Sequence, residues 1–132
     1  DTQISLTSRQ HLFPLIVECK LIHIAKGKTV DLYCRDGLAR FTTGDYAWTN
    51  QEALMLAYVR DGVSTTSHLS PFLEAATRRS PPEYAVVSLP QKCAVSLPDA
   101  ARSEHGRYFK YVHGGQGGKL PGDIAVWHLW VS

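Results

Sequence analysis

The sequence has no long hydrophobic run, little excess charge and few cysteines, and each shortage excludes a class of function. No apolar stretch approaches the roughly 20 residues that span a bilayer, and no secretory signal pattern is present. The formal net charge is only +2 over 132 residues, so we expect no partner among nucleic acids or anionic membranes. The cysteines and histidines lack metal-ligand spacing, so the sequence predicts neither a metal nor a cofactor.

The three cysteines, Cys19, Cys34 and Cys93, are an odd number, which favours reduced thiols in an intracellular protein. A bond between Cys19 and Cys34 is conceivable if a hairpin places them opposite each other, but we expect both thiols to be free. The first residue is Asp1 rather than a methionine, which suggests a processed product or an excised fragment.

The rest of the composition is that of an ordinary globular protein, with 44% hydrophobic and 20% charged residues. The length is sufficient to bury a core, so we expect a single domain over 1–132. Four segments make up the predicted layout: a hairpin over 12–36, helices over about 46–61 and 71–79, and a sheet over 83–131. Within the hairpin, a strand over 12–25 turns at Lys26-Gly27 and returns over 28–35. The final segment, 123–132, is apolar on both faces, which predicts a central strand.

The segment from Asp45 to Gly62 has the signals of a long helix. Asp45 or Thr49 provides an N-cap, and Glu52 completes a capping box with Thr49. The apolar residues that follow form a wide stripe, and Gly62 suits a left-handed C-cap.

The start of this segment, Ala47-Trp48-Thr49-Asn50, resembles the catalytic helix of papain-like cysteine proteases, where a Cys-Trp pair begins a long buried helix. It is most similar to the leader proteases of picornaviruses and the papain-like domains of nidoviruses. Ala47 stands where the family has its nucleophile, and we interpret it as a replaced cysteine, since a thiol in a first helical turn has a lowered pKa. The resemblance implies an α+β fold in which a hairpin and a helical half pack on a C-terminal antiparallel sheet.

A thiol protease also needs an imidazole base, which in this family opens a strand of the C-terminal sheet. His105 fits that place by the resemblance, and His113 is the reserve. Asp123 is the candidate that would orient the base, while a dyad without an acidic partner remains open. His128 lies among Ile124, Val126 and Trp130, which favours a core histidine with satisfied hydrogen bonds.

The resemblance therefore implies a viral papain-like cysteine endopeptidase in an inactive Cys-to-Ala form. Such an enzyme would cleave the viral polyprotein and remove ubiquitin or a ubiquitin-like modifier from host proteins. Trp48, Gly114 and Gly115 would line its substrate groove. We expect a monomer in the host cytoplasm that acts on a polypeptide.

Two other functions compete with this one. A non-catalytic binding module, such as an immunity, inhibitor or host-interaction protein, explains the missing nucleophile directly. A small nuclease using His105, Lys110 and His113 is less favoured, because nothing in the sequence supplies a basic groove.

Overall fold

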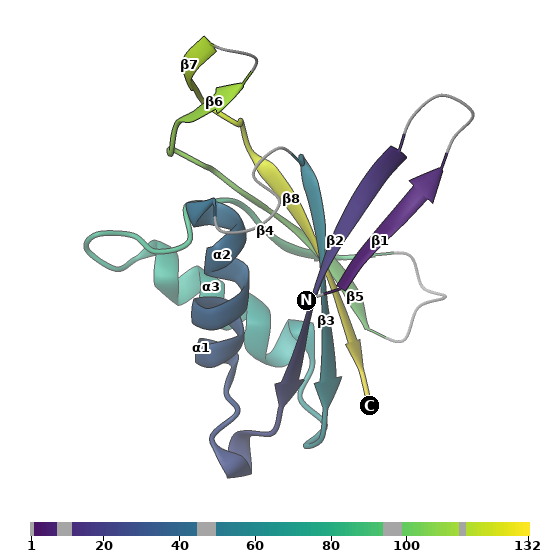
Figure 1. Cartoon of the computed structure of the whole chain (residues 1–132). Coiled ribbons are helices and arrows are strands. Elements are labelled where there is room, and N and C mark those ends of the chain that lie inside the picture. The colour runs from purple at the N-terminus through teal and green to yellow at the C-terminus, as the bar shows by residue number, and fades with distance from the viewer. Residues whose placement is uncertain (1, 8–11, 45–49, 94–98, 114–115) are drawn as a thin grey trace.

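Figure 1 shows a computed structural model of the chain, which describes residues 2–7, 12–44, 50–93, 99–113 and 116–132. The described strands are β1 (Thr2–Thr7), β2 (Leu12–Ile22), β3 (Glu52–Val59), β4 (Val86–Lys92), β5 (Ala100–His105), β6 (Tyr111–His113), β7 (Gln116–Lys119) and β8 (Ile124–Val131). The described helical segments are η1 (Ile24–Lys26), α1 (Val30–Tyr33), η2 (Cys34–Leu38), α2 (Ala39–Thr43), η3 (Thr65–Leu69) and α3 (Ser70–Thr77).

The fold is α+β and is built on one mixed sheet with the strand order β1-β2-β3-β8-β5-β4. β2, β3 and β8 run parallel, whereas β1, β5 and β4 pair antiparallel to their neighbours. The antiparallel sheet expected over 83–131 is therefore wrong in part, because its last strand, β8, joins the parallel centre beside β3. α1, α2 and α3 lie together on one side of the sheet, and β6 and β7 form a separate hairpin beyond its end (Figure 1).

The segment 52–59 is a strand, so the helix expected over 46–61 is wrong across most of its length. Its residues alternate between the helix-covered side, where Ala53, Met55 and Ala57 are fully buried, and the opposite side. A continuous apolar run suits a buried helix or a strand that is apolar on both faces, and periodicity alone does not separate the two. Parallel neighbours on both sides settle the choice here, since β3 pairs with β2 and β8.

The return strand expected over 28–35 is also wrong, because Val30–Thr43 is helical and only β2 remains of the hairpin over 12–36. The Thr29 side chain caps this helix by accepting a hydrogen bond from Leu32 N at 3.2 Å. Gly44, at φ +89°, ends it. The buried residues follow the helical period of three and four: Val30, Tyr33, Cys34, Gly37, Leu38 and Phe41.

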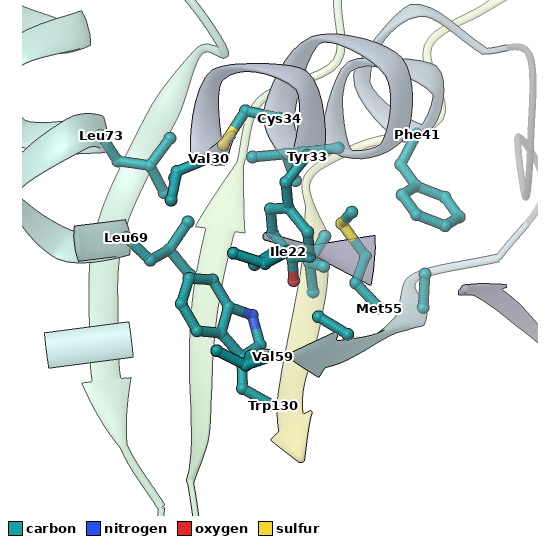
Figure 2. Close-up of a cluster of buried hydrophobic side chains, with 14 of the residues drawn as sticks. Ile22, Val30, Tyr33, Cys34, Phe41, Met55, Val59, Leu69, Leu73 and Trp130 are labelled. Carbon is teal, nitrogen blue, oxygen red and sulfur yellow. The ribbon is translucent and has the colours of Figure 1, made fainter. Parts of the chain in front are cut away.

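The core fills the space between this helix, α3 and the covered face of the sheet (Figure 2). Tyr33 lies at its centre with its ring edge-on to Trp130, at a centroid distance of 5.4 Å. The helix approaches the sheet closely at Gly37, where an added Cβ would lie 2.5 Å from Met55 Cε and 3.1 Å from Lys20 Cε. Glycine therefore leaves room at this point for the ends of the Met55 and Lys20 side chains.

The second half of the chain follows the sequence more closely. α3 corresponds to the helix expected over 71–79, and β8 is the central strand expected over 123–132. His105 ends β5 rather than opening a strand. All three cysteines are free thiols, and Cys34 is buried in the helix. Among the described residues, no helix is long and apolar enough to cross a bilayer.

Candidate functional site

Several of the residues expected to form a protease site fall outside the described part of the chain. Ala47, Trp48, Gly114 and Gly115 are in this group. His113 ends β6, and its side chain is likewise outside the described part. The expected relation between a nucleophile at position 47 and an imidazole therefore stays a prediction.

His105 is fully buried, and both of its ring nitrogens are engaged. Nε2 lies 2.7 Å from Ser103 Oγ, and Nδ1 lies 2.8 Å from the Tyr84 carbonyl oxygen. Asp123 is exposed and precedes Ile124, the residue that pairs with His105 across the strands. With Ser103 and Tyr84 occupying the ring, the described contacts give Asp123 no part in orienting it.

Ser103 connects His105 to a second buried histidine. Its Oγ lies 2.8 Å from His128 Nε2, and His128 Nδ1 lies 2.7 Å from the Tyr33 hydroxyl. A continuous chain of hydrogen bonds therefore runs from α1 through β8 and β5 to the Tyr84 carbonyl. The core role expected for His128 is confirmed. The sequence signal for Ser103 was its position two residues before His105, which places both side chains on one face of a strand.

The chemistry of the end group fixes the direction of every bond in this chain. A carbonyl oxygen only accepts, so the Nδ1 of His105 donates to Tyr84 and a neutral ring leaves Nε2 as an acceptor. Ser103 then donates its hydroxyl proton to His105 and accepts from His128 Nε2. His128 Nδ1 in turn accepts from Tyr33. With both rings neutral, every group in the chain has a matching partner.

Burial keeps the side chains of this hydrogen-bonded chain uncharged. It lowers the pKa of His105 from 6.5 to about 4, against a smaller upward effect of the hydrogen bond to Tyr84. Burial also lowers the pKa of His128 to about 3, and His105 adds to the effect. The pKa of Tyr33 is raised well above its usual value, again mainly by burial. Ser103 and His105 resemble a nucleophile and its base by type, but both are at 0% exposure, and so weak a base removes protons poorly.

The backbone beside this chain is held in an unusual conformation. Tyr84 and Ala85 have φ of 65° and 45°, a region that costs residues with side chains about 1–3 kcal/mol each. The bend directs the Tyr84 carbonyl to His105 and the Ala85 carbonyl to Gly106 N at 2.7 Å. The hydrogen-bonded chain therefore ties the start of β4 to the centre of the sheet.

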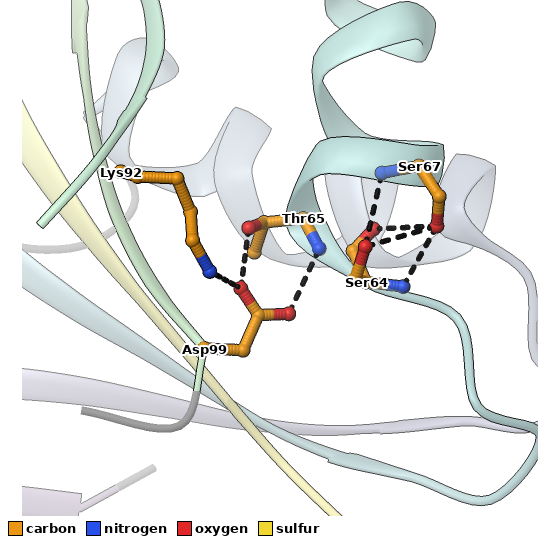
Figure 3. A network of polar contacts seen from close by, with 5 residues as sticks. All are labelled: Ser64, Thr65, Ser67, Lys92 and Asp99. Carbon is orange, nitrogen blue, oxygen red and sulfur yellow. Dashed lines mark hydrogen bonds and ion pairs between the residues drawn. The ribbon is translucent and has the colours of Figure 1, made fainter. Parts of the chain in front are cut away.

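A second polar cluster joins the start of β5 to the segment that leads into α3 (Figure 3). Asp99 accepts hydrogen bonds from Thr65 N at 2.9 Å and Thr65 Oγ1 at 2.5 Å, and Lys92 Nζ lies 3.0 Å away. Burial alone would raise the pKa of Asp99, but the contacts with Thr65 and Lys92 outweigh it and lower this pKa. Every group has a partner, so the cluster is structural. Across the described residues, no group of three or more potential metal ligands comes together.

The side of the sheet opposite the helices carries a band of apolar side chains. We call this surface the open face and define it by Cys19, Leu21, Leu54, Leu56, Tyr58, Trp127, Leu129 and Val131. Strand register aligns its members in rows, with Cys19, Leu56 and Leu129 in one row and Leu21, Tyr58 and Val131 in the next. The covered-side residues alternate with them along each strand.

Large side chains on the open face are in contact with solvent. Tyr58 is 53% exposed, Leu21 44% and Trp127 38%. Arg102 on β5 places its guanidinium 5.5 Å from the centre of the Trp127 ring and pairs with Glu104 at 2.6 Å. The open face is thus an apolar surface bounded by charged side chains on β5. The sequence contained a signal for this surface, because 52–59 and 124–131 are mainly apolar at both parities, whereas a strand covered on one side needs apolar residues at one parity only.

Comparison of the chain with protein-family models, with curated proteins and with solved structures gave no match.

Proposed function

We propose that this chain is a non-catalytic binding module whose open face contacts another protein. The observation that carries the proposal is that the parallel strands β3 and β8 are mainly apolar on both sides, and β2 is apolar on its open side, whereas the described helices cover one side only (Figure 1). All-parallel sheets occur almost only with both faces covered, and the centre of this mixed sheet is parallel. A partner protein on the open face would supply the second covering layer.

The composition of the open face also favours a protein partner. Its exposed large residues include a Trp and a Tyr, the types that contribute most to the energy of protein interfaces. Arg102, stacked on Trp127, adds a third residue type of this kind at the margin. Contiguous exposed apolar surface on a folded protein commonly marks such an interface.

Site-specific photo-cross-linking tests this proposal. A photoreactive phenylalanine analogue replaces Tyr58 or, as a control, Tyr108, which is 79% exposed and lies outside the open face. In the cells that produce the protein, we expect a discrete cross-linked species from position 58 and none from position 108. No adduct from position 58, or the same adduct from position 108, would overturn the proposal.

The protease function stays a prediction with a separate test. The layout that suggested it is changed, since Glu52–Val59 is a strand and no long helix follows Ala47. In a background with Cys19→Ser and Cys93→Ser, which removes the two thiols that are not buried, Ala47→Cys is treated with an irreversible thiol probe. Rapid labelling that His113→Ala or His105→Ala abolishes in a folded chain favours a protease. Labelling no faster than that of a free thiol favours the binding module.

A further inference from the structure

We propose that the protein seated on the open face is a second copy of this chain, an inference that rests on the proposed binding function. The two copies would pack face to face about a two-fold axis, with their helices on the outside. Sheets that stack in this way lie about 10 Å apart and rotate by about 30° relative to each other. A two-fold interface requires a surface that is complementary to itself.

The central strand of the open face has this self-complementarity. Along β3, side chains of one parity point to the open face, in the order Glu52, Leu54, Leu56, Tyr58 and then Arg60, just beyond the strand end. The Arg60 amide continues the ladder by donating to the Ile22 carbonyl at 2.9 Å. The series is acidic at one end, apolar in the middle and basic at the other end, with Leu56 at its midpoint.

Consider a two-fold axis that lies midway between the two sheets, runs perpendicular to β3 and passes over Leu56. This axis places the two β3 strands antiparallel, so that the acidic end of one lies over the basic end of the other. It places Glu52 against the partner's Arg60 and Leu54 against the partner's Tyr58. Each charged pair occurs twice, and both Glu52 and Arg60 are exposed and form no ion pair with another of the described residues. The opposite orientation, with β3 parallel to itself, would place like charges together at both ends.

The same axis also determines how Cys19 on β2 lies relative to the partner copy. Cys19 is aligned with Leu56 in the β2–β3 register and therefore lies in the row of residues along which the axis runs. The partner's Cys19 then faces it across the interface. At a sheet separation of about 10 Å the two Cys19 Cα atoms are too distant for a disulfide, and the packed layer between the sheets should shield both thiols from a maleimide. Cys19 is exposed and free, so the chain carries its own reporter.

Sedimentation equilibrium over a range of concentrations measures the association. We expect a dimer, and Tyr58→Lys should convert it to a monomer, whereas Leu120→Lys, at an exposed apolar residue outside the open face, should leave it unchanged. Glu52→Arg or Arg60→Glu alone should raise the dimer Kd about tenfold, and the two together should bring it back to within about threefold of the original. Circular dichroism confirms that each variant is folded.

The thiol measurement needs no change at the interface. In a Cys93→Ser chain, Cys19 should react with a maleimide more slowly as the protein concentration rises and the dimer forms, and Tyr58→Lys should restore the rate of the monomer. A monomer at every soluble concentration, which is the state expected from the sequence, would overturn the second-copy inference. So would charge reversals without rescue, or a dimer in which Cys19 reacts as fast as in the monomer. A monomer that still gives a discrete adduct to a different protein from position 58 leaves the binding function standing, whereas a monomer without that adduct overturns both.

Discussion

At the scale of single residues, the main feature is a buried chain of four polar side chains that depend on one another. Tyr33, His128, Ser103 and His105 each donate one hydrogen bond, and the Tyr84 carbonyl accepts the last. Because low polarity makes an unpaired polar group costly, the loss of one member affects those on both sides. This dependence predicts large effects from small changes.

His128→Ala should destabilise the protein by about 3 kcal/mol, because it leaves the Tyr33 hydroxyl without its acceptor, removes one of the two hydrogen bonds of Ser103 and opens a cavity. Urea unfolding followed by circular dichroism measures this. The matched control is His68→Ala, since His68 makes only an exposed contact with Ser67 and should change stability by less than about 0.5 kcal/mol. If both variants lose the same free energy of unfolding, the buried hydrogen bonds stabilise the protein no more than the exposed contact of His68 does.

Stability should fall as the pH decreases from about 6.5 to about 4. The unfolded chain binds protons at His105 and His128 near pH 6.5, whereas the folded chain resists until about pH 4 and about pH 3. The unfolded state therefore holds more protons in this window, which costs up to about 1.4 kcal/mol per pH unit for each histidine. Asp99 affects stability only at lower pH, because its stabilising contribution is lost only below its usual pKa of 3.8.

Urea unfolding at a series of pH values checks this expectation. The free energy of unfolding should be level above about pH 7 and decline below it. A chain with His128→Gln should lose about half of the decline, because one of the two histidines is gone. A flat profile between pH 6.5 and 4.5 in the unmodified chain contradicts the neutral, buried state of both rings.

At the scale of elements, two contacts determine how the helices lie on the sheet. Gly37 allows the helix over 30–43 to approach β3, and Asp99 attaches the segment before α3 to the start of β5. Both act between elements that are far apart in the chain. Each can be tested by a single substitution.

Gly37→Ala should destabilise the protein by about 1 kcal/mol. Crowding against Met55 costs about 2 kcal/mol, and the better helix propensity of alanine returns part of it. Thermal unfolding measures the change in stability. Adding Met55→Leu to the Gly37→Ala variant should recover some of the loss, because it removes Met55 Cε, the atom nearest to the new methyl group. An increase in stability from Gly37→Ala alone would mean that the end of the Met55 side chain moves aside at little cost.

Asp99→Ala should cost about 2 kcal/mol, because Thr65 loses both hydrogen bonds at a buried position. Lys92→Ala is the matched control, since its ion pair with Asp99 is largely exposed and should contribute less than about 1 kcal/mol. Chemical denaturation compares the two. If Lys92→Ala costs as much as Asp99→Ala, charge rather than the link to Thr65 holds the cluster together.

At the scale of the whole molecule, the division of the chain into one covered and one open side explains which features the sequence could predict. α3 has a proline at its start, and β8 is apolar at both parities, so local pattern identifies each. The helical period over 30–41 was also present in the sequence, although β-branched and aromatic residues made a return strand look equally suitable.

The segment 52–59 could not be assigned locally. Its alanines, leucines and methionine favour a helix, and only its position between β2 and β8 makes it a strand. The candidate site follows the same rule, because the open face is assembled from three strands that are far apart in the chain. The buried chain likewise needs Tyr33, Ser103 and His128 to be brought together by the fold, and only the core role of His128 could be predicted from its neighbours.

The central claim is that the open face is where this molecule meets another protein. Covalent trapping from position 58, compared with position 108 in the same cells, tests it most directly, because both tyrosines are exposed and only Tyr58 belongs to that face. We predict one defined adduct from position 58, mapped to residues on the open face, and none from position 108. Equal trapping from both positions, or none from position 58, would contradict the account.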